Sequence, residues 1–264
     1  MYGFTYAFQA EVLPNKVKPG DAFIIKVTGT ETSHLPDALL KNKHFYFSRC
    51  GGGCFVAIGA VGIDTQPGVY SIHVKVGGNK PNLELTVRQT DFPTISLTLP
   101  EGKVVPSPEN LERAKREGEK LRSIWPVISD KLWQGSFALP LNNDMSTAFG
   151  TKRIFNRKKT SVHKGIDVRG KKGEEVKASN RGRVVLAGEL FFGGNTLILD
   201  HGQGIYTIYM HMSKFKVGPG DVVSKGDVIG LVGSSGRASG PHLHFGVKVL
   251  NINVNPVSIF KLQL

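Results

Sequence analysis

The sequence has 264 residues, of which 40% are hydrophobic and 21% are charged, as is typical of a globular protein with one large domain or two ordinary ones. It contains no run of about 18 apolar residues, which excludes a transmembrane helix. The formal net charge is +13, and 25 of the 34 basic residues lie within residues 101–264, so this part of the chain favours a polyanionic partner.

Short runs of β-branched and aromatic residues, separated by breaks rich in Gly, Pro and Asn, occupy the first hundred residues. These runs lie at 4–12, 21–28, 43–48, 54–61, 69–76, 82–88 and 94–99. Their spacing predicts an antiparallel β-sandwich of the immunoglobulin-like kind, although the Cys-Trp-Cys core of antibody domains is absent. We assign residues 1–103 to this N-terminal domain, which would target, regulate or cover a site elsewhere in the chain.

The two cysteines of the chain are Cys50 and Cys54, in the segment Cys-Gly-Gly-Gly-Cys. In an exported protein this spacing favours a disulfide across a glycine loop. Free thiols are the main alternative, and a zinc site is disfavoured because no further ligands lie nearby in the sequence.

A helix is predicted next, because Ser107-Pro108-Glu109 combines a hydroxyl N-cap, a proline at the first helical position and an acid near the positive end of the helix dipole. Apolar residues then recur at roughly helical spacing, at Leu111, Ala114, Leu121 and Trp125. We interpret residues 104–126 as a helical linker, and residues 127–264 as a second, β-rich domain.

Histidine spacing in this second domain suggests a metal site. His242 and His244 would point to the same face of a strand, where two imidazoles can share a metal or divide metal binding and proton transfer. His163 and Asp167 are four residues apart with Gly165 between them. A catalytic zinc commonly has three protein ligands and an open position for water, so these two residues with either His242 or His244 would complete a set.

The remaining histidines are assigned from their local context. His211 ends a strand in which Thr207 and Tyr209 share its face, and we expect it to act beside the metal or in catalysis. His201 lies in an Asp-His-Gly turn and is expected to be structural. The same is expected of the histidines outside any ligand spacing, which are His34, His44 and His73.

Several ordered motifs in residues 140–257 resemble those of the M23 metallopeptidases, also called the LytM or lysostaphin family. The matching segments are Ser146-Thr147-Ala148-Phe149-Gly150, His163-x-x-x-Asp167, Asp200-His201-Gly202, Tyr209-Met210-His211-Met212, Val217-Gly218-Pro219-Gly220-Asp221, Gly233-Ser234-Ser235-Gly236 and His242-x-His244. Met212 stands where the family more commonly has Leu, which is a mild apolar change.

The resemblance implies a compact antiparallel β-sheet with zinc in a groove along it. It implies that His163, Asp167 and His244 are the zinc ligands and that His211 and His242 are the catalytic pair. The implied function is a zinc-dependent endopeptidase that cuts stem peptides or cross-links of peptidoglycan. The alternative is an inactive cell-wall binding module or an activator of other wall hydrolases.

The expected function sets further expectations for partners and location. Twelve basic residues between Lys152 and Arg183 form either a solvated surface or a guide toward an anionic cell-wall polymer. No nucleic-acid-binding module is recognisable, so nucleic acid is not an expected partner. We expect an exported monomer, in the periplasm, cell envelope or extracellular space, although Met1-Tyr2-Gly3-Phe4-Thr5 does not begin a signal-peptide pattern.

The bond that is cut stays open at this point. D-Ala–diaminopimelate cross-links and glycine bridges are both candidates, because the shape of the pocket sets the choice. The former is favoured, since glycine-bridge enzymes commonly carry a separate wall-targeting domain that is not recognisable in this sequence.

Overall fold

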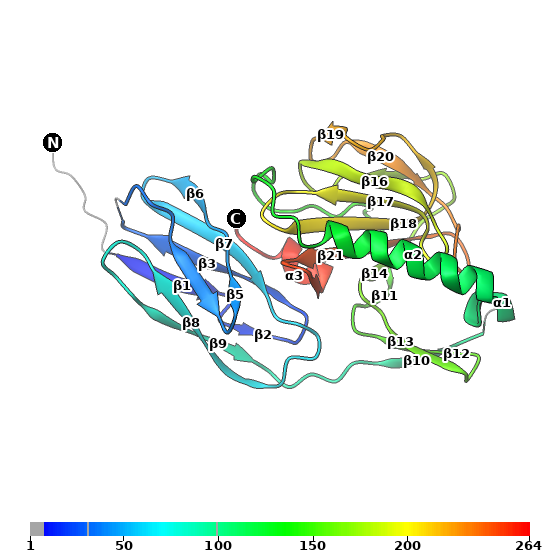
Figure 1. The fold of residues 1–264 in the computed structure, drawn as a ribbon, viewed down its shortest axis with the longest axis horizontal. Helices are drawn as coiled ribbons and strands as arrows, with labels where there is room; N and C mark the ends of the chain where they lie inside the picture. The colour runs from blue at the N-terminus through cyan, green and yellow to red at the C-terminus, as the bar shows by residue number, and fades with distance from the viewer. Residues whose placement is uncertain (1–7, 31, 99) are drawn as a thin grey trace.

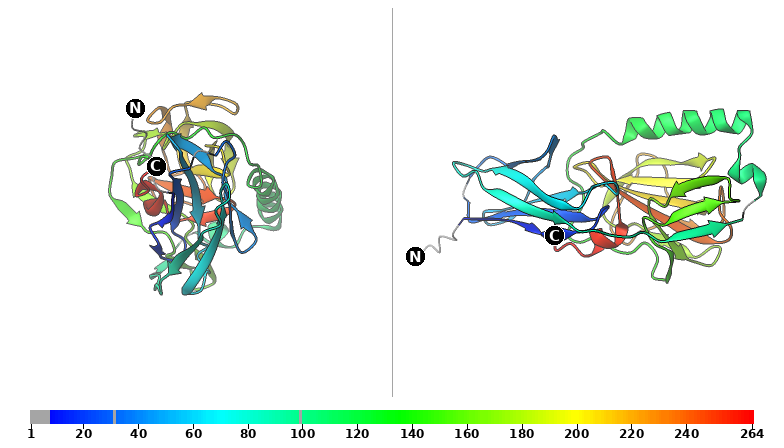
Figure 2. Two further views of the ribbon diagram at one scale, coloured as in Figure 1. Left: turned by 90° about the vertical axis from the view of Figure 1, so that its left-hand side faces the viewer. Right: turned by 90° about the horizontal axis from the view of Figure 1, so that it is seen from below.

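The computed structural model of the chain describes residues 8–30, 32–98 and 100–264. Two β-rich lobes lie side by side along the longest axis, the first drawn blue to cyan and the second green to red (Figure 1). One long helix runs along the outside of the second lobe, as Figure 2 shows from below. The mainly β fold that the sequence predicts is confirmed.

The first lobe is built from two sheets. One has the strand order β1-β3-β7-β6 and the other β2-β9-β8-β4-β5. Their bounds are β1 (Gln9–Leu13), β2 (Lys16–Val17), β3 (Ala22–Thr28), β4 (Asp37–Leu40), β5 (Lys43–His44), β6 (Ser48–Gly51), β7 (Cys54–Ala60), β8 (Gly68–Lys75) and β9 (Asn82–Val87). Phe23 and Phe55 from one sheet and Ile72 and Leu85 from the other share one buried cluster, as alternating inward-facing residues of a two-sheet sandwich do. Its immunoglobulin-like topology stays a prediction.

Two predicted runs of this lobe reach beyond the described residues, since 4–7 and 99 lie outside them. The run at 94–99 forms β10 (Thr94–Leu97), which pairs in parallel with β12 (Lys152–Phe155) of the second lobe rather than with a sandwich strand. β12 also pairs with β13 (Lys159–Val162), so β10 extends a hairpin of the second lobe. The domain boundaries at 103 and 126 stay predictions.

Cys50 and Cys54 form a disulfide that closes the turn between β6 and β7. Gly51 and Gly53 in this turn have φ values of 105° and 71°, a region that favours glycine. The disulfide is therefore the correct one of the three alternatives, and the glycines allow the chain to bend tightly enough to form it.

The predicted helix is confirmed as α2 (Pro108–Ile124), which follows the short α1 (Glu101–Val104). The Ser107 hydroxyl accepts a hydrogen bond from the backbone N–H of Asn110, as expected for an N-cap. None of the α2 residues is buried. Leu121 and Ile124 pack at the edge of a cluster on the second lobe, which consists of Trp125, Leu186, Ile198, Tyr206 and Ile208. The helix therefore rests on the lobe without entering its core.

The second lobe is a ten-stranded sheet whose strand pairs are antiparallel. Its main order is β11-β14-β21-β18-β17-β16-β19, and β15, β20 and β22 pair beside this path. The bounds are β11 (Met145–Thr147), β14 (Ile166–Arg169), β15 (Glu175–Lys177), β16 (Gly182–Leu190), β17 (Gly194–Asp200), β18 (Ile205–Phe215), β19 (Val222–Val223), β20 (Val228–Val232), β21 (His242–Val249) and β22 (Ile252–Val254). The short helix α3 (Pro256–Phe260) follows at the junction of the lobes (Figure 1).

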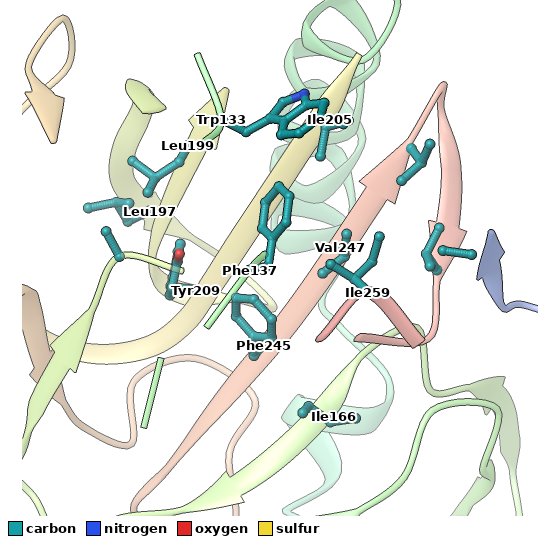
Figure 3. Close-up of a cluster of buried hydrophobic side chains, with 14 of the residues drawn as sticks. Trp133, Phe137, Ile166, Leu197, Leu199, Ile205, Tyr209, Phe245, Val247 and Ile259 are labelled. Atoms are coloured by element: carbon teal, nitrogen blue, oxygen red, sulfur yellow. The ribbon is translucent and has the colours of Figure 1, made fainter. Parts of the chain in front are cut away.

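The core of the second lobe lies on one face of its central strands. Figure 3 shows Tyr209 of β18, Phe245 of β21 and Ile166 of β14 in this cluster. The Tyr209 and Phe245 rings meet with centroids 5.2 Å apart. Because successive side chains of a strand point to opposite faces, this packing turns the residues next to Phe245 and Ile166 toward the other face.

The two lobes share a continuous hydrophobic core. Ala22 and Ile24 of β3 and Ile58 of β7 belong to the same buried cluster as the central strands of the second lobe. The Ser258 hydroxyl of α3 accepts a hydrogen bond from the Ala22 N–H at 2.9 Å. The outer face of one sandwich sheet is thus covered by the second lobe, which fixes the lobes relative to each other.

Candidate metal centre

Strand register brings two of the predicted ligands together. β14 and β21 are antiparallel neighbours in which Asp167 lies opposite His244 and Arg169 lies opposite His242. The residues between them along each strand, Val168 and Leu243, are buried in the core. Asp167, His242 and His244 therefore share the opposite face, as the sequence spacing of the two histidines predicts.

His163 joins them from the segment between β13 and β14. Its Nε2 lies 3.0 Å from Asp167 Oδ1 and 2.9 Å from His244 Nδ1, and the latter two atoms are 2.9 Å apart. One nitrogen or oxygen from each residue thus meets in a small triangle. His163 is only 3% and Asp167 only 6% exposed, so the triangle lies in a largely enclosed position.

The hydrogen bonds around the triangle suit a cation. His163 Nδ1 lies 2.9 Å from the carbonyl oxygen of Ala148; a neutral imidazole that donates this N–H carries a lone pair on Nε2, facing the triangle. The Asp167 carboxylate offers only acceptors. Two imidazole nitrogens and a carboxylate oxygen are a donor set that zinc accepts, so His163, Asp167 and His244 could hold a metal ion.

The backbone at position 165 lies so close to β21 and His244 that only glycine fits there. A Cβ atom there would lie 2.4 Å from the backbone oxygen of Phe245 and 2.8 Å from His244 Nε2. A larger residue would therefore displace the strand or the imidazole. The glycine between His163 and Asp167 lets the chain pass directly over His244.

The electrostatics keep the Asp167 carboxyl charged and the rings of His211 and His244 neutral. Burial alone would raise the pKa of Asp167, but its close contacts with His163 and His244 lower it well below the usual range. Burial lowers the pKa of His244. Burial, together with the neighbouring His244 and His242, lowers the pKa of His211 to about 3. Neutral imidazole is the form that binds a metal or accepts a proton.

Arg153 of β12 is a further residue of the site that the sequence reasoning missed. Its Nη2 donates to Oδ2 of Asp167, which leaves Oδ1 of the same carboxylate in the triangle. The only sequence signal was its membership of the basic cluster from Lys152 to Arg183. Nothing in the spacing distinguished this arginine from its neighbours, because the contact depends on how the β12–β13 hairpin packs against the sheet that contains β14.

His211 and His242 lie next to the triangle. Their ring centroids are 4.8 Å apart, and His242 Nε2 is 3.8 Å from Asp167 Oδ1. His211 Nδ1 bonds the carbonyl oxygen of Ser235 at 2.9 Å, and His242 Nδ1 bonds that of Gly240 at 2.8 Å. The Nε2 atom of each neutral ring is thereby left as a proton acceptor.

The expectation that His211 shares a face with Tyr209 is wrong. Tyr209 packs in the core against Phe245, whereas the His211 ring lies beside His242 on the other face. The backbone of His211 is left-handed, with φ of 65°, and this interrupts the strand alternation. Such strained residues are concentrated at functional sites.

The other histidines lie apart from this group. His201 is fully buried, and its ring bonds the carbonyl oxygen of Arg181 and the hydroxyl of Thr207. This matches its expected structural role. The first lobe carries His34, His44 and His73.

A cavity of about 340 Å³ opens beside the triangle. His163, His211 and His244 line it together with Arg153, Arg237 and one side of α2. A larger hollow of about 670 Å³ lies at the junction of the lobes but contains none of the predicted site residues. The smaller cavity is the relevant one, because two of the three candidate ligands, His163 and His244, line it together with His211.

Comparison with known proteins agrees with this geometry. Residues 161–256 match the model of peptidase family M23. The DD-carboxypeptidase/endopeptidase Mpg of Neisseria meningitidis is 41% identical over 98 residues, which cover 37% of this chain and 23% of the relative. The peptidoglycan DD-endopeptidase ShyA of Vibrio cholerae is 37% identical over 112 residues, which cover 42% of this chain and 26% of the relative. The chain thus spans about a quarter of the length of these relatives.

A crystal structure from Pseudomonas aeruginosa, described as a peptidase M23, is similar over both lobes. It superposes with a TM-score of 0.70 at 27% identity and covers 92% of this chain and 93% of that one. The family match, the relatives and this structure agree on the second lobe. Through residues 161–256, the second lobe is thus similar to peptidase family M23.

Proposed function

We propose that this protein is a zinc-dependent endopeptidase that hydrolyses peptide bonds in the stem peptides or cross-links of peptidoglycan. The observation that carries the proposal is the meeting of His163 Nε2, Asp167 Oδ1 and His244 Nδ1 within about 3 Å of one another. Two relatives whose names specify peptidoglycan or DD-peptidase activity support the substrate class.

The three residues of the triangle would hold the ion. Zinc, when bound, polarises the scissile carbonyl and lowers the pKa of water to about 7. Asp167 is kept in place by Arg153 on its other oxygen, and His163 by the carbonyl oxygen of Ala148. These outer contacts orient the ligands before any substrate enters.

His211 and His242 would carry out the proton transfers and stabilise developing charge. A neutral imidazole beside the scissile bond can accept a proton from the attacking water and return it to the leaving amine. The second imidazole, in its protonated form, can donate a hydrogen bond from Nε2 to the oxygen on which negative charge develops. The sequence contains no His-Glu-x-x-His motif, so a glutamate of that motif is not available as the base.

We also propose that the protein works outside the cytoplasm, in the cell envelope or beyond it, where peptidoglycan lies. The Cys50–Cys54 disulfide supports this location, since disulfides persist in oxidising compartments. Among the described residues, no helix is long and apolar enough to cross a membrane. The basic residues between Lys152 and Arg183 would favour approach to an anionic wall polymer.

The first prediction separates ligands from catalytic residues. His244→Ala should lose bound zinc and peptidase activity together, because it removes one of three ligands. His242→Ala should keep about one zinc per chain and lose activity by about 100-fold or more, as removal of an acid–base group does. Zinc is measured by mass spectrometry of the purified protein, and activity by release of muropeptides from purified peptidoglycan.

His73→Ala, on the exposed side of β8, is the matched control and should change neither quantity. Full activity in His244→Ala would contradict the ligand assignment. If the purified protein releases no muropeptide with any metal, the alternative of a non-catalytic wall-binding or activator module replaces this proposal.

A further inference from the structure

Two arginines line the cavity beside the triangle, Arg153 and Arg237. They come from different parts of the second lobe: Arg153 lies on β12, and Arg237 lies in the segment between β20 and β21. Because both face the cavity that His163 and His244 also line, any substrate group entering there meets two guanidinium groups next to the reacting bond.

Aromatic rings hold Arg237 in place. Its guanidinium carbon lies 4.4 Å from the centroid of the Phe192 ring and 4.9 Å from that of the Phe155 ring. Its backbone N–H donates to the carbonyl oxygen of Phe192 at 2.9 Å. Within residues 8–30, 32–98 and 100–264, no ion pair joins the Arg237 guanidinium to a carboxylate. The side chain is oriented by stacking, and its donors stay available for a ligand.

Arg153, which lines the same cavity, has one donor without a partner. One of its terminal nitrogens pairs with Asp167, but its buried Nε has no hydrogen-bond partner. A buried donor without a partner is costly. Burial, followed by the charge of Arg153, lowers the pKa of Arg237, as expected when a second positive charge disfavours the charged form of a group.

The other charges around the cavity do not balance this pair. Glu117 of α2 also lines it, but its carboxylate already accepts from Arg113 at 2.7 Å and from the backbone N–H of Phe191 at 2.8 Å. Lys164 adds a further positive charge. An anionic ligand group in the cavity would be attracted by both arginines and would offset the repulsion between them.

We propose that Arg237, with Arg153 beside it, binds a substrate carboxylate next to the scissile bond. Guanidinium groups recognise carboxylates through paired, charge-assisted hydrogen bonds. The inference rests on the proposed function and narrows its substrate class to peptide bonds whose released amine carries a free carboxylate on the same carbon. D-Ala–diaminopimelate cross-links and terminal D-Ala–D-Ala bonds have such a carboxylate, whereas bonds inside a glycine bridge lack it.

The second prediction tests this with matched acids and amides. The substrates are a linear peptide ending in D-alanyl-D-alanine and a cross-linked muropeptide dimer, each with the relevant carboxylate either free or amidated. The zinc-loaded full chain should cleave at least one free-acid form about tenfold or more faster in kcat/KM than its amide, as expected for a charge-assisted contact. The pair that shows the preference identifies which carboxylate is bound.

Arg237→Gln should abolish this preference while zinc content stays at the wild-type level. Lys152→Gln is the matched control, since it removes one positive charge from the exposed neighbour of Arg153 and should keep the preference. Binding gives a second readout: in the zinc-loaded His211→Ala background, calorimetry should show tighter binding of the free acid than of the amide, and Arg237→Gln should remove the difference.

The outcomes separate the two proposals. Hydrolysis with equal rates on acids and amides, or a preference that survives Arg237→Gln, overturns the carboxylate site and leaves the peptidase proposal standing. An acid preference in binding without hydrolysis of any substrate overturns the peptidase proposal and leaves the carboxylate site standing. Cleavage of a pentaglycine with an amidated C-terminus, which lacks such a carboxylate, at a rate similar to the free-acid substrates also overturns the carboxylate site.

Discussion

Three of the four site histidines are oriented by a hydrogen bond on the side of the ring away from the reacting centre. Nδ1 of His163, His211 and His242 bonds a backbone carbonyl oxygen, at Ala148, Ser235 and Gly240 respectively. The bond selects the tautomer in which Nε2 carries the lone pair. The chemistry of the site therefore depends on three carbonyl groups that belong to loops and turns, and their residue types are irrelevant to this role.

The ring of His201 is also fixed by hydrogen bonds, but its burial affects the stability of the fold. Burial lowers the pKa of its ring to about 4, from an ordinary value of 6.5. Because the folded state holds the neutral form, the unfolded state binds more protons between pH 6.5 and 4. The contribution of neutral His201 to the free energy of unfolding is complete above pH 6.5 and is lost as the pH falls toward 4.

The third prediction follows from this titration. The stability advantage of the wild type over His201→Gln should shrink by about 2 kcal/mol between pH 7 and pH 5, because only the wild type loses the neutral-histidine contribution. Urea unfolding in chelator measures this difference without interference from metal binding. His73→Gln, exposed on β8, should follow the wild type at both pH values. An advantage that is independent of pH would rule out titration of His201.

At the scale of elements, α2 forms one side of the cavity although none of its residues is buried. The helix is attached to the second lobe by the apolar contacts of Leu121 and Ile124 and by the polar contacts of Glu117. Glu117 joins the helix to the turn between β16 and β17 through the Phe191 N–H. A helix attached in this way can open locally at a smaller cost than the strands of the sheet.

The fourth prediction concerns this attachment. Glu117→Ala should raise amide hydrogen exchange across α2 by about tenfold, since the helix loses two hydrogen bonds of which one reaches the sheet. Hydrogen–deuterium exchange with mass spectrometry measures the change. Glu119→Ala, which removes only an exposed 3.8 Å pair with Arg122, should leave the exchange unchanged. Equal exchange in both variants would show that apolar contacts alone hold the helix.

At the scale of the whole molecule, the first lobe is part of the folding unit rather than an appended module. Ile24 is 1% exposed and belongs to the core that continues into the second lobe. Asn255 donates to Asp21 across the junction at 3.0 Å, and Gln203 donates to the carbonyl oxygen of Phe47 at 3.1 Å. β10 carries the connection further by pairing with β12, the strand of Arg153. The sandwich is thus linked to the edge of the site through the backbone.

The fifth prediction is that the lobes unfold together. Ile24→Ala should lower the free energy of unfolding by about 2–5 kcal/mol, as loss of a buried aliphatic side chain does, and the protein should keep a single thermal transition. Differential scanning calorimetry shows both effects. Val69→Ala on the sandwich, where the side chain is 62% exposed, should be nearly neutral. Two separate transitions in the wild type would contradict a shared core.

The sequence by itself determined the mainly β composition, the helix start at Ser107 and the candidate residues, because these depend on local spacing and residue chemistry. His242-x-His244 predicts a shared face from the period of a strand alone. The same rule failed at His211, because a left-handed residue interrupts the alternation and no local pattern marks that position.

Only the tertiary structure decided which distant groups meet. The register of β14 against β21 places Asp167 opposite His244, and hairpin packing brings Arg153 to the same carboxylate. The continuous core between the lobes and the stacking of Arg237 between two phenylalanines likewise join residues far apart in the chain. These contacts arise from the packing of whole strands against one another, so the local sequence around each residue does not predict its partner.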